Sequence, residues 1–196
     1  RKKRNNKRKQ WLSFMSAIDF SVIGRVGVLF GGVSAERDVS LDSGHAVFSA
    51  LLTLGVEVVA IDLQENVVEK ITLANIDAAF IVLHGGIGED GRLQALLDIM
   101  NIPYTGSDTQ SSSLAMNKLL SKQLWQGVGV ATSPFVVLNN KTNFAQAIEV
   151  LGGSAMVKPA HEGSSIGMGF AYTAQELETA YLNAVKYDAV VLAEKV

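Results

Sequence analysis

The sequence predicts an α/β protein in which an N-terminal doubly wound parallel-sheet domain is followed by an incomplete α+β domain. Short apolar runs alternate with segments of helical periodicity in the first half, which is typical of a parallel sheet with crossover helices. Glycine-rich loops follow the first and third of these runs, at the position where ligands of such sheets bind. Composition shifts between residues 107 and 129, which indicates that a second domain begins there.

The first domain is predicted from five apolar segments. A buried strand over 25–30 (RVGVLF) ends at a pair of glycines, and apolar residues then recur at helical spacing over 41–54, with Gly55 as the stop. The remaining elements are two strands and a helix, predicted over 56–63, 78–83 and 93–100.

The second domain is predicted to open with one helix over 111–126, which ends at Gly127. Gly152 is a natural helix stop, and Thr173 is a natural N-cap. The elements after the first helix are, in order, strand 135–138, helix 142–151, strand 155–158, strand 169–172, helix 173–187 and a strand from 189.

These elements divide the chain into three parts. Residues 1–24 are a basic tail and lead-in that we expect to be disordered, 25–117 form a Rossmann-like domain, and 118–196 form the truncated first part of the second domain. The chain stops at Val196, inside an apolar strand-like run, so we interpret it as a fragment of a longer protein.

Composition favours a soluble cytosolic protein. There is no cysteine, which excludes a disulfide framework and thiolate metal sites, and no apolar stretch approaches the roughly 18 residues of a membrane span. Residues 1–10 hold seven of the 17 basic residues, which leaves ten against 19 acidic ones and a net charge of −9 for 11–196. A nucleic-acid-binding arm is therefore disfavoured against a disordered tail or sequence outside the mature protein, with Met15 as a plausible true start.

The loop after the first strand carries Glu36 and Arg37. Its glycines lack the G-x-G-x-x-G spacing of a nicotinamide or flavin site. An acid at the mouth of a parallel sheet is suited to hold an ammonium group, and the alternative is an ordinary surface ion pair. We favour the binding role because of its position.

The loop over 84–91 (HGGIGEDG) contains four glycines, one histidine and two acids. His84 is a candidate hydrogen-bond donor, proton carrier or loop anchor. Metal ligation by His84, Glu89 and Asp90 is disfavoured, because three ligands from one short loop rarely close a site. Asp90 is alternatively a cap for the helix that follows.

The densest signal follows the strand at 155–158. Lys158 ends this strand directly before a loop that contains Gly163, Ser164 and Ser165, which is typical of a phosphate cradle although not of a P-loop. The alternative is that Lys158 pairs with a buried acid. Lys118 and Lys122 lie in a predicted helix, where lysine side chains are usually solvated. We also expect the side chain of His161 to face solvent.

Five of these segments resemble the D-alanine–D-alanine ligase family in order and spacing. They lie at 31–44, 84–97, 104–107, 116–118 and 157–168. The resemblance covers 26–196, roughly the first half to three-fifths of such a ligase. Asn117 stands where the family usually has Asp, and Ala95 where Gly is usual.

The resemblance implies an ATP-grasp fold, preceded by a pre-ATP-grasp domain, and the ligation of two D-alanines through an acyl phosphate for peptidoglycan. It implies a cytoplasmic homodimer that uses ATP with Mg²⁺ or Mn²⁺. The implied catalytic residues are Glu36 for the ammonium of the first D-alanine, His84 near its carboxylate, and Ser164 in the loop above it. The implied ATP contacts are the phosphate-binding side chains of Lys118 and Lys158, the backbone at Gly163 and Ser165, and the adenine-binding strand of Glu194 and Lys195.

The resemblance places the metal ligands after Val196, so no metal ligand is assigned in this chain, and the chain alone is expected to be inactive. Two alternatives stay open. One is a ligase with D-lactate or D-serine as the second substrate, and the other is a non-catalytic module that binds a nucleotide or an amino acid. A nucleic-acid binder is the weakest candidate.

Overall fold

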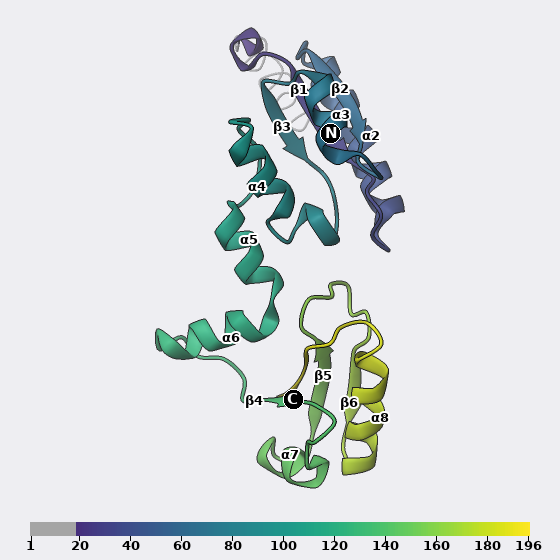
Figure 1. Cartoon of the computed structure of the whole chain (residues 1–196), viewed down its shortest axis with the longest axis vertical. Helices are drawn as coiled ribbons and strands as arrows, with labels where there is room; N and C mark the ends of the chain where they lie inside the picture. The colour runs from purple at the N-terminus through teal and green to yellow at the C-terminus, as the bar shows by residue number, and fades with distance from the viewer. Residues whose placement is uncertain (1–18) are drawn as a thin grey trace, which may run out of the picture. The chain divides into compact units, whose positions relative to one another are not determined.

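A computed structural model describes residues 19–196 (Figure 1). The basic segment 1–10 and Met15 lie outside the described residues. The chain divides into two compact units, one that ends at Thr109 and one that begins at Gln110. This division lies before the expected boundary between 117 and 118. Within 19–196, no helix has both the length and the apolarity of a membrane span.

The first unit is built on the parallel sheet that the sequence predicts. Its strands are β1 (Val26–Phe30), β2 (Val58–Asp62) and β3 (Ala78–Ile81), in the order β2-β1-β3. Phe30 is in register with Asp62, and Leu29 with Ile81. The carboxyl ends of all three strands therefore lie at one edge, next to both glycine-rich loops.

Helices cover both faces of this sheet, which confirms the doubly wound arrangement. They are α2 (Arg37–Thr53), α3 (Val67–Ala74) and α4 (Arg92–Ile99). The short 3-10 turn η1 (Phe20–Ile23) precedes β1, and η2 (Gly86–Gly88) lies between β3 and α4. Val28 and Phe30 pack against α2, whereas Leu29 packs with α3 and α4. Gly44 lets α2 approach β1 closely, because a Cβ there would lie 2.5 Å from the ring of Phe30.

The sequence did not predict α3. This helix has eight residues, it lies between Asn66 and Asn75 in left-handed conformations, and only Ile71 is buried in it. So short a segment with one buried position gives little periodicity to recognise.

The second unit is an antiparallel sheet with two helices on one face. Its strands are β4 (Phe135–Leu138), β5 (Ala155–Pro159), β6 (Gly169–Ala171) and β7 (Val191–Lys195), in the order β4-β7-β5-β6. The two helices, α7 (Phe144–Val150) and α8 (Ala174–Ala184), pack on the alternate residues that form the core. Thr173 caps α8 as predicted, since its Oγ1 accepts a hydrogen bond from the Glu176 N–H at 3.2 Å.

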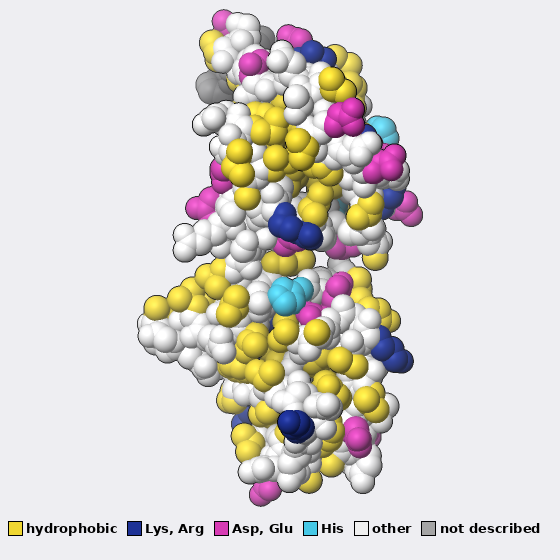
Figure 2. Space-filling model, viewed as in Figure 1, with side chains coloured by type: hydrophobic (Ala, Val, Ile, Leu, Met, Phe, Trp, Pro, Cys, Tyr) yellow, Lys and Arg dark blue, Asp and Glu magenta, His cyan; other side chains and the backbone are white. Residues whose placement is uncertain are grey.

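The single helix predicted over 111–126 is wrong. The structure has α5 (Thr109–Met116) and α6 (Lys118–Gly127), separated at Asn117. Asn117 is extended, and its Oδ1 accepts a hydrogen bond from the Leu120 N–H at 3.0 Å, so it starts a new helix. Hydrophobic side chains gather over α6 on the surface in Figure 2. The exposed ones are Leu120, Leu124, Trp125 and Val128.

Candidate active site

The Glu36 loop turns sharply at the end of β1. Gly31 and Gly32 have positive φ angles of 79° and 74°, which glycine adopts without strain. Arg37 then begins α2 and forms a bidentate pair with Asp62, at 2.8 and 2.7 Å, while it also donates to the Gly32 carbonyl at 3.0 Å. The hydrogen bonds from the Arg37 guanidinium lower the pKa of the Asp62 carboxyl. The pair thus fixes the loop that presents Glu36.

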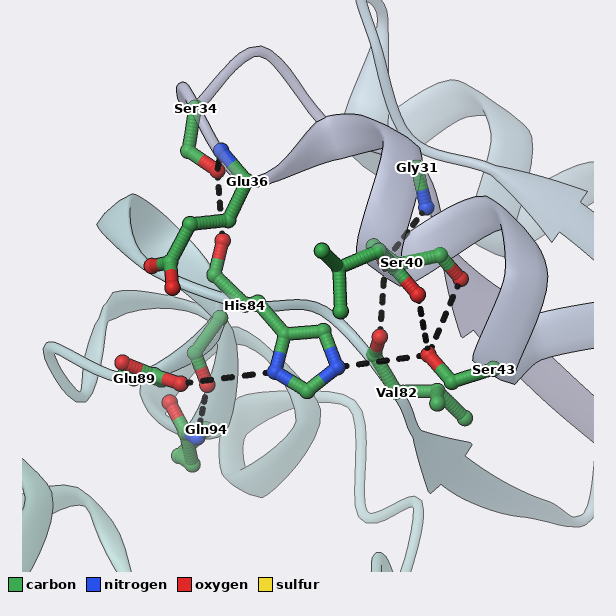
Figure 3. Close-up of polar contacts among 11 residues, drawn as sticks. Gly31, Ser34, Glu36, Ser40, Ser43, Val82, His84, Glu89 and Gln94 are labelled. Carbon is green, nitrogen blue, oxygen red and sulfur yellow. Dashed lines mark hydrogen bonds and ion pairs between the residues drawn. The ribbon is translucent and has the colours of Figure 1, made fainter. Parts of the chain in front are cut away.

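Ser34 joins this loop to the His84 loop. Its hydroxyl donates to the His84 carbonyl at 2.6 Å and accepts from the Glu36 N–H at 3.1 Å. The Glu36 carboxylate lies against Gly85, where a Cβ would be 3.0 Å from Oε2. Figure 3 shows Glu36, His84 and Glu89 gathered around this junction. The structure therefore brings together the two residues predicted to bind the first amino acid.

Hydrogen bonds define the state of the His84 ring. Its Nε2 lies 3.2 Å from Ser43 Oγ, and the hydroxyl of Ser43 donates to the Val39 carbonyl at 2.7 Å. Because that proton is used, Nε2–H must be the donor to Ser43 in neutral His84. The other nitrogen, Nδ1, lies 3.9 Å from a Glu89 carboxylate oxygen.

Ser40 is a buried residue of this region that sequence reasoning missed. It is fully buried, and its hydroxyl accepts from the Gly31 N–H at 2.9 Å and donates to the Val82 carbonyl at 2.6 Å. It therefore links the ends of β1 and β3. The available signal was its helical spacing with Gly44 and Val47, which places a hydroxyl on the core face of α2.

Asp90 is alternatively predicted to cap the next helix, but the N-cap of α4 is Gly91, and Asp90 bonds to the start of the helix from one residue earlier. Asp90 Oδ1 accepts from the Arg92 N–H at 3.0 Å, at the first residue of α4, and Oδ2 holds the Arg92 guanidinium at 2.5 and 2.8 Å. Within residues 19–196, no three histidine, aspartate or glutamate side chains form a group that could hold a metal ion.

A pocket of about 390 Å³ in the second unit collects most of the predicted ATP-binding side chains. Its charged lining residues are Lys118, Lys122, Lys158 and Glu194. Three lysines against one glutamate give this lining a net charge of +2, which favours an anion.

Lys158 forms an ion pair with Glu194, in agreement with the alternative prediction that it pairs with a buried acid. Its Nζ lies 2.7 Å from Oε2 of Glu194, whose side chain is 14% exposed. Met156 pairs with Glu194, and Lys158 with Leu192, in the β5–β7 register, so both charged side chains lie on one face of the sheet. This pairing still leaves Lys158 in the pocket lining.

The expectation that Lys122 is solvated is wrong. Its side chain is 5% exposed, and Nζ donates to Thr132 Oγ1 at 2.7 Å and to the Ser133 carbonyl at 3.0 Å. It also lies 3.5 Å from Glu194 Oε1. The burial of Lys122 depends on a tertiary contact, because the segment before β4 supplies its oxygen acceptors. The residues next to Lys122 in the sequence do not indicate this contact.

Lys118 is half-buried beside the glycine-rich loop. Its Nζ donates to the carbonyls of Glu162 and, at 3.4 Å, Ala160. Burial, and after it the charge of Lys158, lower the pKa of Lys118. Two lysines with few water contacts near each other are a favourable arrangement for a phosphate, which would relieve their repulsion.

The loop after β5 holds two serines in left-handed conformations. Ser164 and Ser165 have φ angles of 47° and 63°, and the Ile166 N–H donates to the Gly163 carbonyl at 3.0 Å. Positive φ is uncommon outside glycine, and such residues cluster at ligand sites. The strained backbone of these two serines makes the loop a candidate ligand site.

Lys195 lies apart from the other predicted ATP contacts. Its side chain follows the opposite face of the sheet from Glu194, where Cε would be 3.4 Å from a Cβ on Gly152. Any contact with a base bound beside Glu194 must therefore come from its backbone.

Comparisons with known proteins match parts of both units to models of one family. Residues 64–107 match the model of the D-ala D-ala ligase N-terminus, and residues 124–196 match that of the D-ala D-ala ligase C-terminus. The chain belongs to the D-alanine–D-alanine ligase family. The D-alanine–D-alanine ligase of Pseudomonas putida is 52% identical over 180 residues, which is 92% of this chain and 57% of that protein. The counterpart from Saccharophagus degradans is 51% identical over 175 residues, with 89% and 56% covered.

Solved structures of the family show the same fold. The D-alanine–D-alanine ligase of Bacillus anthracis has a TM-score of 0.80 and 35% identity, over 88% of this chain and 57% of that one. The same enzyme complexed with ATP has a TM-score of 0.77 and 34% identity, over 88% and 59%. The chain thus spans somewhat more than half the length of these relatives. Its mixed α/β fold is the ATP-grasp fold of the family.

Proposed function

We propose that this chain supplies the first amino-acid site and part of the ATP site of an ATP-dependent D-alanine–D-alanine ligase. The observation that carries the proposal is the pocket of Lys118, Lys158 and Glu194, followed by the serine–glycine loop. It is supported by the similarity to a D-alanine–D-alanine ligase complexed with ATP.

The first unit binds the first D-alanine in this proposal. Glu36 accepts the ammonium group, and His84 lies near the carboxylate. The support is their junction through Ser34, which holds an acid and an imidazole in fixed neighbouring positions. Ser164, in the serine–glycine loop of the second unit, is included among the proposed catalytic residues.

The second unit binds ATP. Lys118 and Lys158 contact the phosphates as side chains, and the backbone N–H groups at Gly163 and Ser165 contact them as neutral donors. Glu194 and the backbone of Lys195 line the adenine site. The net positive lining supports this assignment, because fixed cations stabilise charge that develops on a transferred phosphate.

The proposed reaction has two steps. A carboxylate oxygen of the first D-alanine attacks the γ-phosphorus, the bond to the bridging oxygen breaks, and ADP leaves with that electron pair. The amine of a second D-alanine then attacks the carbonyl carbon of the acyl phosphate. Phosphate leaves, the amine loses a proton, and D-alanyl-D-alanine forms for peptidoglycan.

We include Mg²⁺ with ATP in this proposal, together with a cytoplasmic location and a homodimer. Residues 19–196 present no group of three acidic or histidine side chains for a metal, so no ligand in them is assigned and no step is derived through the ion.

Equilibrium binding to the chain tests the proposal. ATP and D-alanine are titrated separately by calorimetry, with GTP and L-alanine as matched controls. We expect ATP and D-alanine to bind and the controls to bind at least tenfold more weakly. Equal binding of D- and L-alanine, or of ATP and GTP, would contradict it.

A further inference from the structure

Three segments of the second unit meet at His161, which follows β5 and precedes the serine–glycine loop. His161 Nδ1 lies 2.7 Å from Asp188 Oδ2, in the turn before β7. Its Nε2 lies 2.9 Å from Asn117 Nδ2, at the start of α6. His161 is exposed, as the sequence predicts, with 48% of its side chain accessible, and it holds these two contacts as well.

The contacts of Asn117 fix the protonation of the ring. Asn117 Oδ1 accepts from the Leu120 N–H at 3.0 Å, so its Nδ2 group faces His161 as a donor. Nε2 of His161 must then be an acceptor without a proton. Neutral His161 thus carries its proton on Nδ1 and donates to Asp188.

Asp188 is the hydrogen-bond partner of the other ring nitrogen of His161, Nδ1. Its side chain is 10% exposed, and it also accepts from the backbone N–H groups of His161 at 2.8 Å and Val190 at 3.0 Å. Burial opposes the charged form, but these hydrogen bonds outweigh it and lower the pKa of Asp188. Asp188 is therefore a carboxylate in neutral solution and keeps its bond to either form of the ring.

Asn117 connects His161 to Lys118, the next residue. The Lys118 N–H donates to the Ala160 carbonyl at 3.0 Å, and the Lys118 ammonium contacts the Glu162 carbonyl. The start of α6 is thus attached to the residues on both sides of His161. The charged groups that face this junction are Asp188, Lys118, Lys158, Glu162 and Glu194.

We propose that His161 is a positioning residue that holds the serine–glycine loop to the start of α6, and that protonation of its Nε2 breaks this link. A proton on Nε2 would face the Asn117 NH₂ group, and two donors cannot pair. Rotation of the amide would restore that pair only by removing the cap from Leu120. The inference rests on the proposed function insofar as the loop and Lys118 bind ATP.

Two substitutions at one position separate the link from the helix cap. Asn117→Ser keeps an oxygen that caps α6 but removes the donor to His161. Asn117→Asp keeps the cap and replaces the donor with an acceptor, which suits the protonated ring. His161→Gln assigns the ring signals and removes the titrating group.

The measurement is the ¹⁵N spectrum of the histidine rings and the loop amides of the 196-residue chain, between pH 5 and 8. We expect the Nδ1–H form of His161 in the parent chain. The amides of Gly163 and Lys118 should move as His161 titrates. This movement should be lost in Asn117→Ser, and His161 should titrate at higher pH in Asn117→Asp. An Nε2–H form, or amide changes that are the same in all variants, would overturn the proposal.

ATP affinity gives the functional readout in the same variants. We expect about three- to tenfold weaker binding by the parent chain once His161 is protonated, a range set by one hydrogen bond. Asn117→Ser should be weak at both pH values, and Asn117→Asp should bind better at the acidic one. Equal affinities in all variants would overturn the coupling. If the parent chain binds no ATP at any pH, the proposed function fails, and the ring and amide spectra still decide the link.

Discussion

The Nζ of Lys158 lies 2.7 Å from the carboxylate of Glu194 on a sheet face where Lys122 also reaches the same carboxylate. Glu194 thus forms ion pairs with both Lys122 and Lys158. It lowers the repulsion between them without cancelling it, so the pocket keeps an excess of positive charge. The site can therefore be stable when empty and still attract an anion.

Glu194→Gln should destabilise the second unit. The substitution removes the charge that faces Lys122, and an uncompensated buried ammonium is costly, so we expect a loss of about 3 kcal/mol in the free energy of unfolding. Urea denaturation followed by tryptophan fluorescence measures it. Lys195→Met, next in sequence but on the opposite face, is the control. A loss no greater than that of the control would show that Lys122 finds enough partners in Thr132 and Ser133.

Ser40→Ala should weaken the first unit. The hydroxyl satisfies both the Gly31 N–H and the Val82 carbonyl, and both groups would be left buried without this partner. We expect a loss of about 1–3 kcal/mol in the free energy of unfolding. Ser49→Ala, at an exposed position of α2, should change it by less than about 0.5 kcal/mol. Similar losses in the two variants would contradict the bridging role of Ser40.

The pair between Arg37 and Asp62 should contribute stability that depends on pH. The pKa of Asp62 is lower in the folded chain than in the unfolded one, mainly through the hydrogen bond from Arg37. Its contribution is therefore complete above the unfolded value, near pH 4, and is lost as the pH falls through the folded value. Because the pair is partly exposed, its size is modest.

Asp62→Asn tests this dependence. The parent chain should be the more stable at pH 6–7, and the difference in free energy of unfolding should shrink as the pH falls below 4. The control is Asp38→Asn, which changes an exposed acid on α2, the helix that begins with Arg37. A difference that grows toward acidic pH would have the wrong sign for this account.

Glu36→Gln should weaken D-alanine binding. If Glu36 holds the ammonium group, loss of its charge should reduce the affinity by about tenfold or more. Calorimetric titration with D-alanine measures the change, and Glu89→Gln is the matched control from the neighbouring loop. Weaker binding in the Glu89 variant than in the Glu36 variant would reassign the ammonium site.

The strands were predictable because each is a short apolar run that ends at a glycine, a polar residue or a charged residue. The two loops after β1 and β3 were predictable as a pair, since parallel strands bring their carboxyl ends to one edge. The helix break at Asn117 was missed because the apolar and polar residues of 111–126 continue across it. Only the cap to Leu120 reveals the new start.

The missed residues share one physical cause, which is a partner distant in the sequence. Lys122 is buried because Thr132 and Ser133 accept its hydrogen bonds, and His161 is oriented by Asp188, 27 residues away. Ser40 bridges to Val82 across the sheet. A sequence pattern predicts which face of an element a side chain lies on. It does not predict which distant residue will accept or donate the hydrogen bond of that side chain.

The central claim is that the lysine pocket of the second unit binds the phosphates of ATP. The most direct test is titration of the ¹⁵N-labelled chain with ATP, in the parent and in Lys118→Met and Lys158→Met, with Lys186→Met in the exposed turn after α8 as control. We expect shifts at the amides of Gly163, Ser165 and Glu194, and at least tenfold weaker binding in the two pocket variants alone. ATP binding that is equal in all four chains, or that shifts none of these amides, would contradict it.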